Sequence, residues 1–346
     1  MSIMRDQIAL PGNTRRVLGL SLLFCIAAGL ILYHGHSASR LRTYRQSRIL
    51  LDTVVDIIVA SSDEQQANQA ILSAFREMER IENVLSKYRT DSQIALVNRK
   101  TRGEPVPLSA EVYGLIQRSL DYSILTDGFF DITIGGLVDL WGIGTSYEHV
   151  PDRSSLRDIL PYISYKYVRM RPKRSIALRY PQVSLDLGGI AKGYSIDRGI
   201  QMLEQHHITS ALINAGGDIR CIGMKPDGTP WRIGIKHPRK EGMCGVIELH
   251  NAAVATSGDY ERFFIHEGTR YHHLLDPQTG MPARGCRSVT ILAQTAEKAD
   301  VLATAVFIMG PSRGLAFLEE QGDVEGMIIQ ADGEAVVSSG FTFQPK

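Results

Sequence analysis

The order of the predicted strands constrains the fold of this chain more than any other feature of its sequence. Short β-branched or alternating segments follow one another near Leu212, Ile219, Ile233, Ile247, Val254, Phe264 and Leu274, and another covers Val289 to Leu292. Helical patterns follow the polar cap at residues 61–63 and cover Ser109 to Leu125, Ala191 to about His206 and Ala296 to Met309. A doubly wound parallel sheet requires strict alternation of strands and helices. The sequence therefore predicts an α+β fold with largely antiparallel sheets and packed helices.

Three further segments are predicted as strands because they are rich in β-branched or alternating apolar residues. They are Ile49 to Ala60, Phe129 to Ile134 and Val183 to Leu187. A glycine-rich turn is expected from Gly135 to Gly144. From there to about Ile176 the chain is basic and interrupted by proline, which predicts a weakly structured connection.

The first 48 residues differ from the rest of the 346-residue chain in charge and hydropathy. They hold seven arginines and one acidic residue, a formal charge of +6, so the remaining residues sum to −5 and the whole chain to +1. An uncharged apolar stretch of 17 residues lies between Arg16 and His34. Positive charge before such a stretch is typical of an export signal or a membrane anchor.

Two export routes fit this leader. Residues 14–18 resemble the twin-arginine signal, and adjacent arginines also fit the basic start of an ordinary signal. We therefore expect an export signal or N-terminal membrane anchor at residues 1–38, a basic linker at 39–48 and a folded domain at 49–346. The domain is expected on the periplasmic side, either soluble after cleavage or anchored to the inner membrane.

The composition excludes several classes of protein. A balance of 38 basic against 37 acidic residues excludes a polybasic nucleic-acid binder, so no nucleic-acid partner is expected. The hydrophobic and charged fractions exclude disordered, collagen-like and disulfide-scaffold proteins. Cys221, Cys244 and Cys286 lack zinc-site spacing, and three free thiols are favoured over a bridge between the first two. Walker, Rossmann, His-Glu-x-x-His and Gly-x-Ser-x-Gly motifs are also missing from the sequence.

Residues 184–194 place a carboxylate, two glycines and a lysine where a strand is expected to meet a helix. Glycine lets the backbone approach a ligand closely, and the first turn of a helix favours anions. Asp186, Gly188-Gly189 and Lys192 together fit a site for a phosphate and a sugar or base edge. The glycine pair alone is more typical of a tight connection between a strand and a helix.

Asp300 and Thr304 lie one turn apart on one face of a predicted helix. A carboxylate and a hydroxyl oxygen suit a hard cation such as Mg²⁺, which proteins commonly hold with one or two carboxylates and substrate phosphates. The alternative is structural: Asp300 would interact with the dipole at the helix start, and Thr304 would bond back to the preceding turn.

Two adjacent histidines, His272 and His273, close a predicted strand that runs into a proline-glycine turn. Neighbouring residues of a strand point to opposite faces, so one of the two can enter a given site. An imidazole beside a phosphate could take the proton of an attacking hydroxyl. Strand histidines are more often structural or solvent-facing, so the spacing alone leaves both alternatives open.

These clusters, together with several neighbouring motifs, resemble the ApbE family, the FAD:protein FMN transferases, from about Ile49 to Gly310. Seven motifs agree in order: Ser86-Lys87-Tyr88; Phe130 to Thr133 with Leu137 to Gly142; Asp186 to Gly193; Asn214 to Asp218; Thr256 to Glu261; His273 to Pro277 with Thr279-Gly280; and Ala299-Asp300 with Thr304-Ala305. Each motif is weak by itself, whereas the ordered set is specific.

The resemblance implies an ApbE-type flavin transferase fold, FAD as substrate, Mg²⁺ as cofactor, and transfer of FMN to a Ser or Thr hydroxyl of an acceptor protein with release of AMP. It implies that His273 is the catalytic base and that Gly189, Asp300 and Thr304 bind the metal. The FAD contacts that it implies are Leu51, Tyr88, Phe129, Phe130, Asp131, Asp186, Lys192 and Leu274. The acceptor is expected to be a membrane redox subunit, and a twin-arginine leader would fit the nitrous-oxide-respiration (NosX-like) branch.

The chain departs from the family pattern at three places. Leu51-Asp52-Thr53 stands where many members carry Met-Gly-Thr, Gly135-Gly136 replaces a more usual Gly-Pro, and His272 adds a second imidazole beside the expected base. Two other activities compete with transfer. The same residues would support Mg²⁺-dependent hydrolysis of FAD to FMN and AMP, and a flavin-delivery protein would bind FAD without chemistry. A base beside a cation argues against binding alone.

Overall fold

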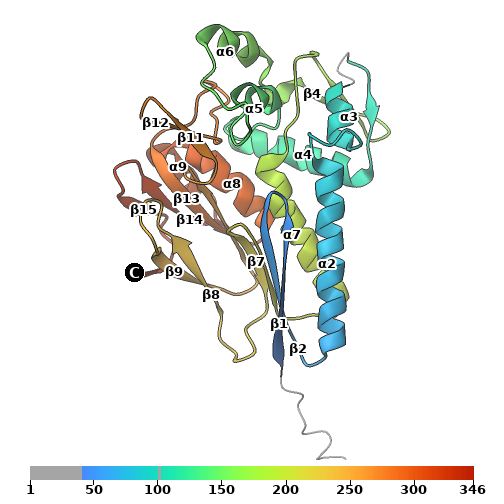
Figure 1. The fold of residues 1–346 in the computed structure, drawn as a ribbon, viewed down its shortest axis with the longest axis vertical. Helices are drawn as coiled ribbons and strands as arrows, with labels where there is room; N and C mark the ends of the chain where they lie inside the picture. Colours follow the sequence, from blue (N-terminus) through green and yellow to red (C-terminus); the bar gives the residue numbers. More distant parts are fainter. Residues whose placement is uncertain (1–40, 100–102) are drawn as a thin grey trace, which may run out of the picture. The chain divides into compact units, whose positions relative to one another are not determined.

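An eight-stranded sheet is the largest element of the part of the chain that the structure describes, residues 41–99 and 103–346 (Figure 1). In this computed structural model the strand order is β1 (Arg42–Leu50), β2 (Thr53–Ser61), β6 (Ala211–Ala215), β7 (Asp218–Ile222), β10 (Ala253–Gly258), β13 (Cys286–Ala293), β14 (Glu325–Gln330) and β15 (Ala335–Val337). The ladders from β2 to β15 are antiparallel. The predicted α+β fold with antiparallel sheets is confirmed.

Three smaller antiparallel sheets accompany the large one. One pairs β11 (Phe263–His266) with β12 (Thr269–His272). A second has the order β16 (Gln344–Pro345), β9 (Met243–Leu249) and β8 (Trp231–Lys236), and a third has the order β3 (Val106–Pro107), β5 (Ser175–Leu178) and β4 (Val168–Arg171). By its internal contacts the chain divides at Arg42, and all these elements except the first residue of β1 belong to the unit Thr43–Lys346.

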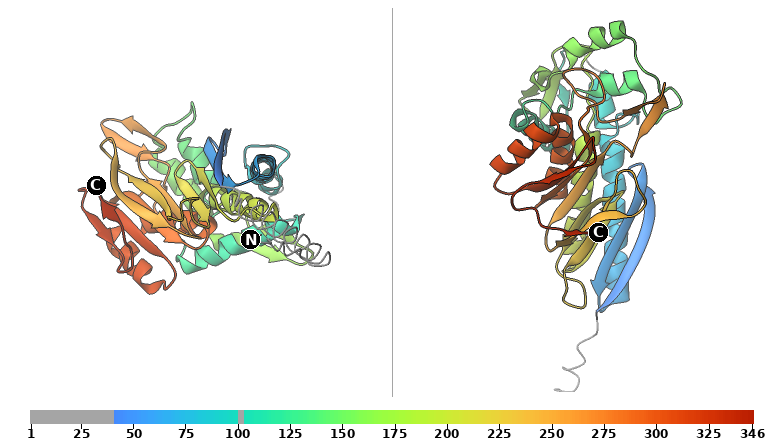
Figure 2. Two further views of the ribbon diagram at one scale, coloured as in Figure 1. Left: turned by 90° about the horizontal axis from the view of Figure 1, so that it is seen from below. Right: turned by 90° about the vertical axis from the view of Figure 1, so that its left-hand side faces the viewer.

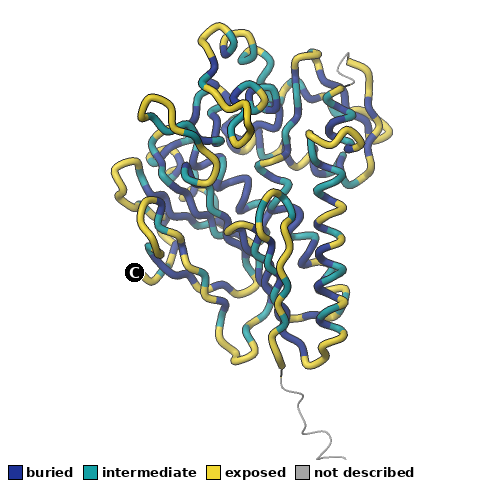
Figure 3. Tube along the Cα trace, in the orientation of Figure 1, coloured by how far each residue is buried: buried dark blue, intermediate teal, exposed yellow. Residues whose placement is uncertain are grey.

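Helices α2 (Glu64–Leu85), α7 (Gly188–Gln205) and α8 (Ala296–Met309) form the main helical layer, and α7 packs against the other two (Figures 1 and 2). The described part of the chain also contains α3 (Gln93–Arg99), α4 (Ala110–Leu125), α5 (Gly135–Trp141), α6 (Arg153–Ile159) and α9 (Pro311–Glu320), with short 3₁₀ turns at Leu160–Tyr162 and Tyr165–Tyr167. The buried trace in Figure 3 runs through α7, α8 and the strands beneath them, where the hydrophobic core lies.

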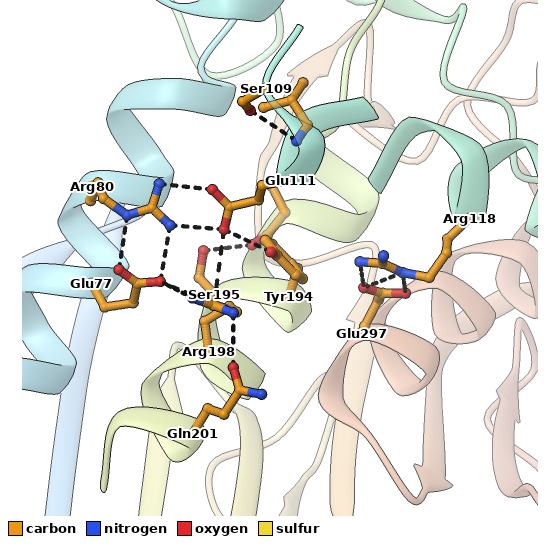
Figure 4. Close-up of polar contacts among 12 residues, drawn as sticks. Glu77, Arg80, Ser109, Glu111, Arg118, Tyr194, Ser195, Arg198, Gln201 and Glu297 are labelled. Atoms are coloured by element: carbon orange, nitrogen blue, oxygen red, sulfur yellow. Dashed lines mark hydrogen bonds and ion pairs between the residues drawn. The ribbon is translucent and has the colours of Figure 1, made fainter. Parts of the chain in front are cut away.

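An ion-pair network joins α2, α4 and α7 (Figure 4). Arg80 donates to both oxygens of Glu77 and of Glu111, at 2.8 to 2.9 Å. Arg198 of α7 also donates to Glu77, and the Tyr194 hydroxyl donates to Glu111 at 2.8 Å. The network therefore holds α7, which begins with Gly188-Gly189, in place against α2 and α4.

Several predicted helices begin where the sequence places them. Asp63 accepts hydrogen bonds from Gln65 N and Gln66 N at the start of α2, and Ser109 Oγ accepts one from Val112 N at the start of α4. Helix α8 has the predicted bounds. Side-chain acceptors at these positions satisfy backbone donors that the first helical turn leaves unpaired.

The N-terminal strand differs from the prediction. Residues 42–48, expected as a linker, lie in β1, and the predicted strand from Ile49 to Ala60 is broken by a turn at Leu51-Asp52. Both turn residues have left-handed backbone angles, with φ of 55° and 56°, as a two-residue hairpin requires. Strand β1 is at the edge of the sheet and largely exposed. Charged edge strands show little hydrophobic alternation, so β1 could not be predicted from the sequence pattern.

The strand predicted from Phe129 to Ile134 is wrong, because the segment is a series of turns. Asp131 Oδ1 accepts hydrogen bonds from the Thr133 N–H and hydroxyl, at 2.8 and 2.7 Å, which closes a local turn. The glycine-rich turn after it is mostly helix α5. Residues 183–187 are also predicted as a strand. They pair with the segment at Ile134 through one isolated parallel bridge, Ile134 to Ser184, and form no regular strand.

The predicted leader at residues 1–38 lies outside the described residues. Within residues 41–99 and 103–346 no helix is long and apolar enough to cross a membrane. Cys221, Cys244 and Cys286 are free thiols, with the first and last buried.

Candidate active site

The start of α7 brings backbone and side chains of distant segments together. Asp186 N donates to Ile132 O at 2.8 Å, and Asp186 Oδ1 accepts a hydrogen bond from Gly188 N at 2.7 Å. A Cβ added at Gly189 would lie 3.2 Å from the Phe130 ring and 3.8 Å from Thr304 Oγ1. The absence of a side chain at Gly189 thus allows the Phe130 ring to pack closely on the start of α7, whereas the distance to Thr304 on α8 is an ordinary contact.

Two of the predicted metal ligands lie on α8, facing α7. Asp300 is 6% exposed, and its Oδ2 accepts a hydrogen bond from Gly193 N at 2.9 Å. Thr304 Oγ1 is 3.3 Å from Ser257 Oγ. The structure therefore gathers a carboxylate, two hydroxyls and the backbone of Gly189, a set of hard oxygen donors that suits Mg²⁺.

The electrostatics of Asp300 agree with a cation site. Burial raises the pKa of this carboxyl, and the negative charge of Asp218 raises it further, against the opposing effects of Lys192 and the Gly193 N–H. A buried carboxylate with too little compensating charge would be stabilised by a bound divalent cation. Within the described part of the chain no three His, Cys, Asp or Glu side chains gather as a metal site. The candidate donors are instead one carboxylate, hydroxyl oxygens and a backbone carbonyl.

Lys192 connects α7 to two further motifs of the sequence, Asn214 to Asp218 and Thr256 to Glu261. Its Nζ is 2.8 Å from Asp218 Oδ2, and Asp218 Oδ1 accepts a hydrogen bond from Thr256 N at 3.1 Å. Burial by itself would lower the pKa of Lys192, but the charges of Asp218 and Asp300 raise it above the ordinary value. The ammonium group is therefore positively charged at neutral pH, close to the candidate metal ligands.

The two histidines occupy different environments. His272 is buried; its Nε2 donates to Ala283 O at 2.9 Å, while its Nδ1 accepts from Leu274 N at 3.3 Å. His273 is half-buried, directly after β12, and its Nδ1 donates to Arg262 O at 3.3 Å. A carbonyl can only accept, so the proton is on Nδ1 and the lone pair of His273 is on Nε2. Burial lowers the pKa of His273, which keeps the imidazole neutral and able to accept a proton.

Lys87 is a residue that the sequence analysis placed in a motif but gave no role. Its ammonium group is buried, 2.8 Å from Asp139 Oδ1, 3.4 Å from Asp186 Oδ2 and 2.9 Å from Gly135 O. It therefore joins the start of α5 to the start of α7 and neutralises two carboxylates. The only sign of such a role in the sequence is that Lys87 lies in the Ser86-Lys87-Tyr88 motif.

The other predicted FAD contacts are distributed unevenly. Tyr88 is 68% exposed next to Lys87, and Leu274 is buried with its carbonyl accepting a hydrogen bond from Ala283 N. Leu51 lies in the β1–β2 turn, where its N–H donates to Glu82 Oε1 at 3.1 Å. Tyr88 follows Lys87, which contacts Asp186. Leu274 follows His273 directly, and Leu51 precedes Asp52, which pairs with Arg262 on the segment opposite His273.

The side chains of Phe129 and Asp131 contact other residues of the protein. The guanidinium of Arg313 lies 4.4 Å from the centre of the Phe129 ring. The Asp131 carboxylate is buried, with one oxygen bound by Thr133 and the other accepting from Tyr165 N at 2.7 Å. The carboxylate thus accepts three hydrogen bonds from the protein itself, and the FAD contacts of both residues stay predictions.

The fold and the donor set define a class of protein that is already known. Residues 51–328 match the ApbE family. The chain is 33% identical over 339 residues to the FAD:protein FMN transferase of Treponema pallidum, covering 93% of both chains, and 33% identical over 302 residues to one from Klebsiella pneumoniae, covering 86% and 92%.

Solved structures agree with the sequence comparison. The ApbE protein of Thermotoga maritima is similar with a TM-score of 0.82 and 37% identity, over 86% of this chain and 97% of that one. The flavin transferase ApbE of Vibrio cholerae has a TM-score of 0.78 and 30% identity, over 87% and 98%. The chain belongs to the ApbE family of flavin transferases.

Proposed function

We propose that this protein transfers the FMN moiety of FAD to a Ser or Thr hydroxyl of an acceptor protein and releases AMP, with Mg²⁺ as the metal. The observation that carries the proposal is the state of His273: its Nδ1 donates to a backbone carbonyl, so Nε2 presents a lone pair, and its pKa is lowered. A neutral imidazole held in one tautomer is suited to remove a proton from a hydroxyl. The names of the relatives supply the substrate.

The residues around His273 have complementary tasks in this reaction. Mg²⁺ held by Asp300, Thr304 and the Gly189 carbonyl would neutralise negative charge on the pyrophosphate of FAD. Lys192 adds a fixed positive charge in the same region, and the first turn of α7 would favour an anion there. His273 takes the proton of the acceptor hydroxyl as its oxygen attacks the FMN phosphorus.

The test separates transfer from its two alternatives. The purified protein is incubated with FAD, Mg²⁺ and a candidate acceptor domain of a membrane redox protein, and the mass of the acceptor and the release of AMP are followed. An acceptor mass increased by FMN supports transfer. AMP release with an unchanged acceptor supports hydrolysis of FAD, and bound FAD with neither product contradicts both enzymatic activities.

We further propose that the protein acts on the periplasmic side of the membrane, because its first residues combine basic charge with an apolar stretch. The proposed acceptor is accordingly a membrane redox subunit. Export can be tested by fusing residues 1–38 to a reporter that is active outside the cytoplasm. The nitrous-oxide-respiration branch would follow only if export requires Arg15 and Arg16 and the twin-arginine machinery.

A further inference from the structure

Two lysines of the candidate site are already held in close ion pairs. Lys192 Nζ is 2.8 Å from Asp218. Lys87 Nζ is 2.8 Å from Asp139 and 3.4 Å from Asp186, and its side chain is 6% exposed. If Lys192 turned toward a phosphate, the Asp218 carboxylate, 3% exposed, would lose its partner; if Lys87 did so, the Asp186 carboxylate, 14% exposed, would lose its partner. Leaving such a carboxylate uncompensated is costly.

Arg262 is held far more loosely than these lysines. Its Nη2 lies 3.7 Å from Asp52 Oδ2, beyond normal hydrogen-bond distance, and the two side chains are 53% and 79% exposed. Exposed pairs of this kind contribute little to stability. The guanidinium can therefore exchange Asp52 for a stronger anion at little cost.

Arg262 also lies next to the proposed base. His273 N donates to Arg262 O at 3.1 Å, which extends the β11–β12 ladder by one pair beyond Phe263 and His272. Residues opposite each other in an antiparallel pair share a face, with Cβ atoms roughly 4.5–5.5 Å apart. After burial itself, the positive charge of Arg262 is among the influences that lower the pKa of His273, which agrees with this proximity.

We propose that Arg262 is a catalytic residue that binds the phosphoryl group of FAD under attack, and that Asp52 holds its guanidinium in the flavin-free protein. The proposal rests on the proposed function. In the reaction the acceptor oxygen bonds to the FMN phosphorus, the bond from that phosphorus to the bridging oxygen breaks, AMP leaves with the electron pair, and His273 takes the proton. A guanidinium presents planar paired donors to the phosphoryl oxygens during this exchange.

Asp52 makes this arrangement particular to the chain. It stands in the two-residue turn between β1 and β2 with φ of 56°, a conformation that Asp tolerates better than most residues. That turn brings its carboxylate to Arg262. A carboxylate at this place competes with phosphate for the guanidinium, so it lowers the affinity for FAD until the flavin displaces it.

The first test compares two flavins, because riboflavin has the isoalloxazine ring but no phosphate. Dissociation constants for FAD and riboflavin are measured by flavin fluorescence, without metal, for the parent protein, Arg262→Ala and Arg262→Lys. We expect Arg262→Ala to weaken FAD binding about tenfold and to leave riboflavin binding unchanged, with Arg262→Lys between the two. Arg270→Ala is the matched control, because Arg270 is on the same hairpin and packs on Phe263; it should bind both flavins like the parent.

An FAD affinity of Arg262→Ala equal to that of the parent would overturn the proposal, as would an equal loss for riboflavin. Thermal unfolding of each variant verifies that it is folded. The second test uses Asp52→Ala, which should tighten FAD binding by about two- to fivefold, the range of an exposed ion pair. The gain should vanish when Arg262 is also alanine; a gain that persists there would show that Asp52 does not act through Arg262.

The transfer reaction separates this inference from the proposed function. With acceptor and Mg²⁺ present, Arg262→Ala should lower kcat about 100-fold, whereas Arg270→Ala should not. A parent protein that transfers FMN while Arg262→Ala transfers at the same rate contradicts the role of Arg262 alone. A parent protein that forms no product contradicts the proposed function, and the flavin comparison still decides whether Arg262 binds the phosphates.

Discussion

Adjacent histidines show how strongly a single position decides a role. His272 and His273 differ by one residue, yet both nitrogens of His272 are hydrogen-bonded inside the protein, and its ring packs edge-on against Phe307 at 5.4 Å. The His273 ring is bound through Nδ1 alone among the described residues. The alternation of side chains along the strand separates the structural imidazole from the one that can act as a base.

Replacing His273 by alanine should remove the base and leave the FAD site in place. We expect kcat for FMN transfer to fall by roughly 10²- to 10⁴-fold, with the dissociation constant for FAD little changed. Acceptor mass and flavin fluorescence measure the two quantities. His272→Asn serves as a comparison. It should lower the thermal midpoint and change the transfer rate per folded molecule only slightly. Transfer by His273→Ala at the parent rate would refute the assignment of the base.

The raised pKa of Asp300 predicts how stability of the metal-free protein depends on pH. Folding favours the protonated carboxyl, so the free energy of unfolding should decrease as pH rises from about 4, the ordinary value, through the raised folded pKa, and should then level off. Added Mg²⁺ should restore stability above that range. Thermal melts with EDTA and with Mg²⁺ measure both effects. Asp300→Asn should abolish both, and a parent midpoint that is independent of metal would contradict the site.

At the scale of elements, the sequence predicted what is buried and regular. Amphipathic spacing and side-chain caps located α2, α4 and α8, because core packing and backbone satisfaction both depend on nearby residues. It failed at residues 129–134, where a side-chain bond of Asp131 outcompetes the β-pattern, and at β1, whose exposed residues show no core face. The ordered motifs predicted candidate metal and base residues, whereas the ion pairs of Lys87 and Arg262 depend on contacts between distant segments.

The network around Glu77 gives a prediction for the packing of α2 against α7. Hydrogen bonds from Arg80 lower the pKa of Glu77 to about 2, so its stabilising effect is present above the unfolded carboxyl pKa and is lost as pH falls toward 2. Glu77→Gln should reduce the free energy of unfolding at neutral pH by about 1 kcal/mol, since the partners are partly screened by solvent. Urea unfolding measures this change. Glu79→Gln, exposed on the same helix, should be neutral; equal effects of the two would rule out the network as the cause.

For the whole molecule, the folded unit begins earlier than the family match. The match starts at residue 51, whereas β1 starts at Arg42 and pairs with β2 at the edge of the eight-stranded sheet. An exposed edge of β2 would present unpaired backbone groups to other chains. Strand β1, apart from its first residue, therefore belongs to the domain and protects its sheet.

Truncation tests this boundary. A protein that begins at residue 41 should be monodisperse and should unfold cooperatively, while one that begins at residue 53 lacks β1 and should unfold at a lower temperature and aggregate. Light scattering and thermal melts distinguish the two. Equal midpoints and equal solubility would show that β1 is dispensable.

Trp141 is one of two tryptophans in the chain; it is fully buried, and its indole N–H donates to Gly280 O at 2.7 Å. Its ring lies 5.5 Å from Tyr271 and 6.5 Å from Phe264, the aromatic pair of the hairpin that leads into His273. Indole emission overlaps flavin absorption, so a Trp231→Phe protein would carry a single tryptophan, beside the hairpin that leads into His273. Quenching of that one signal would time the arrival of FAD in stopped-flow experiments, with no label attached to the protein.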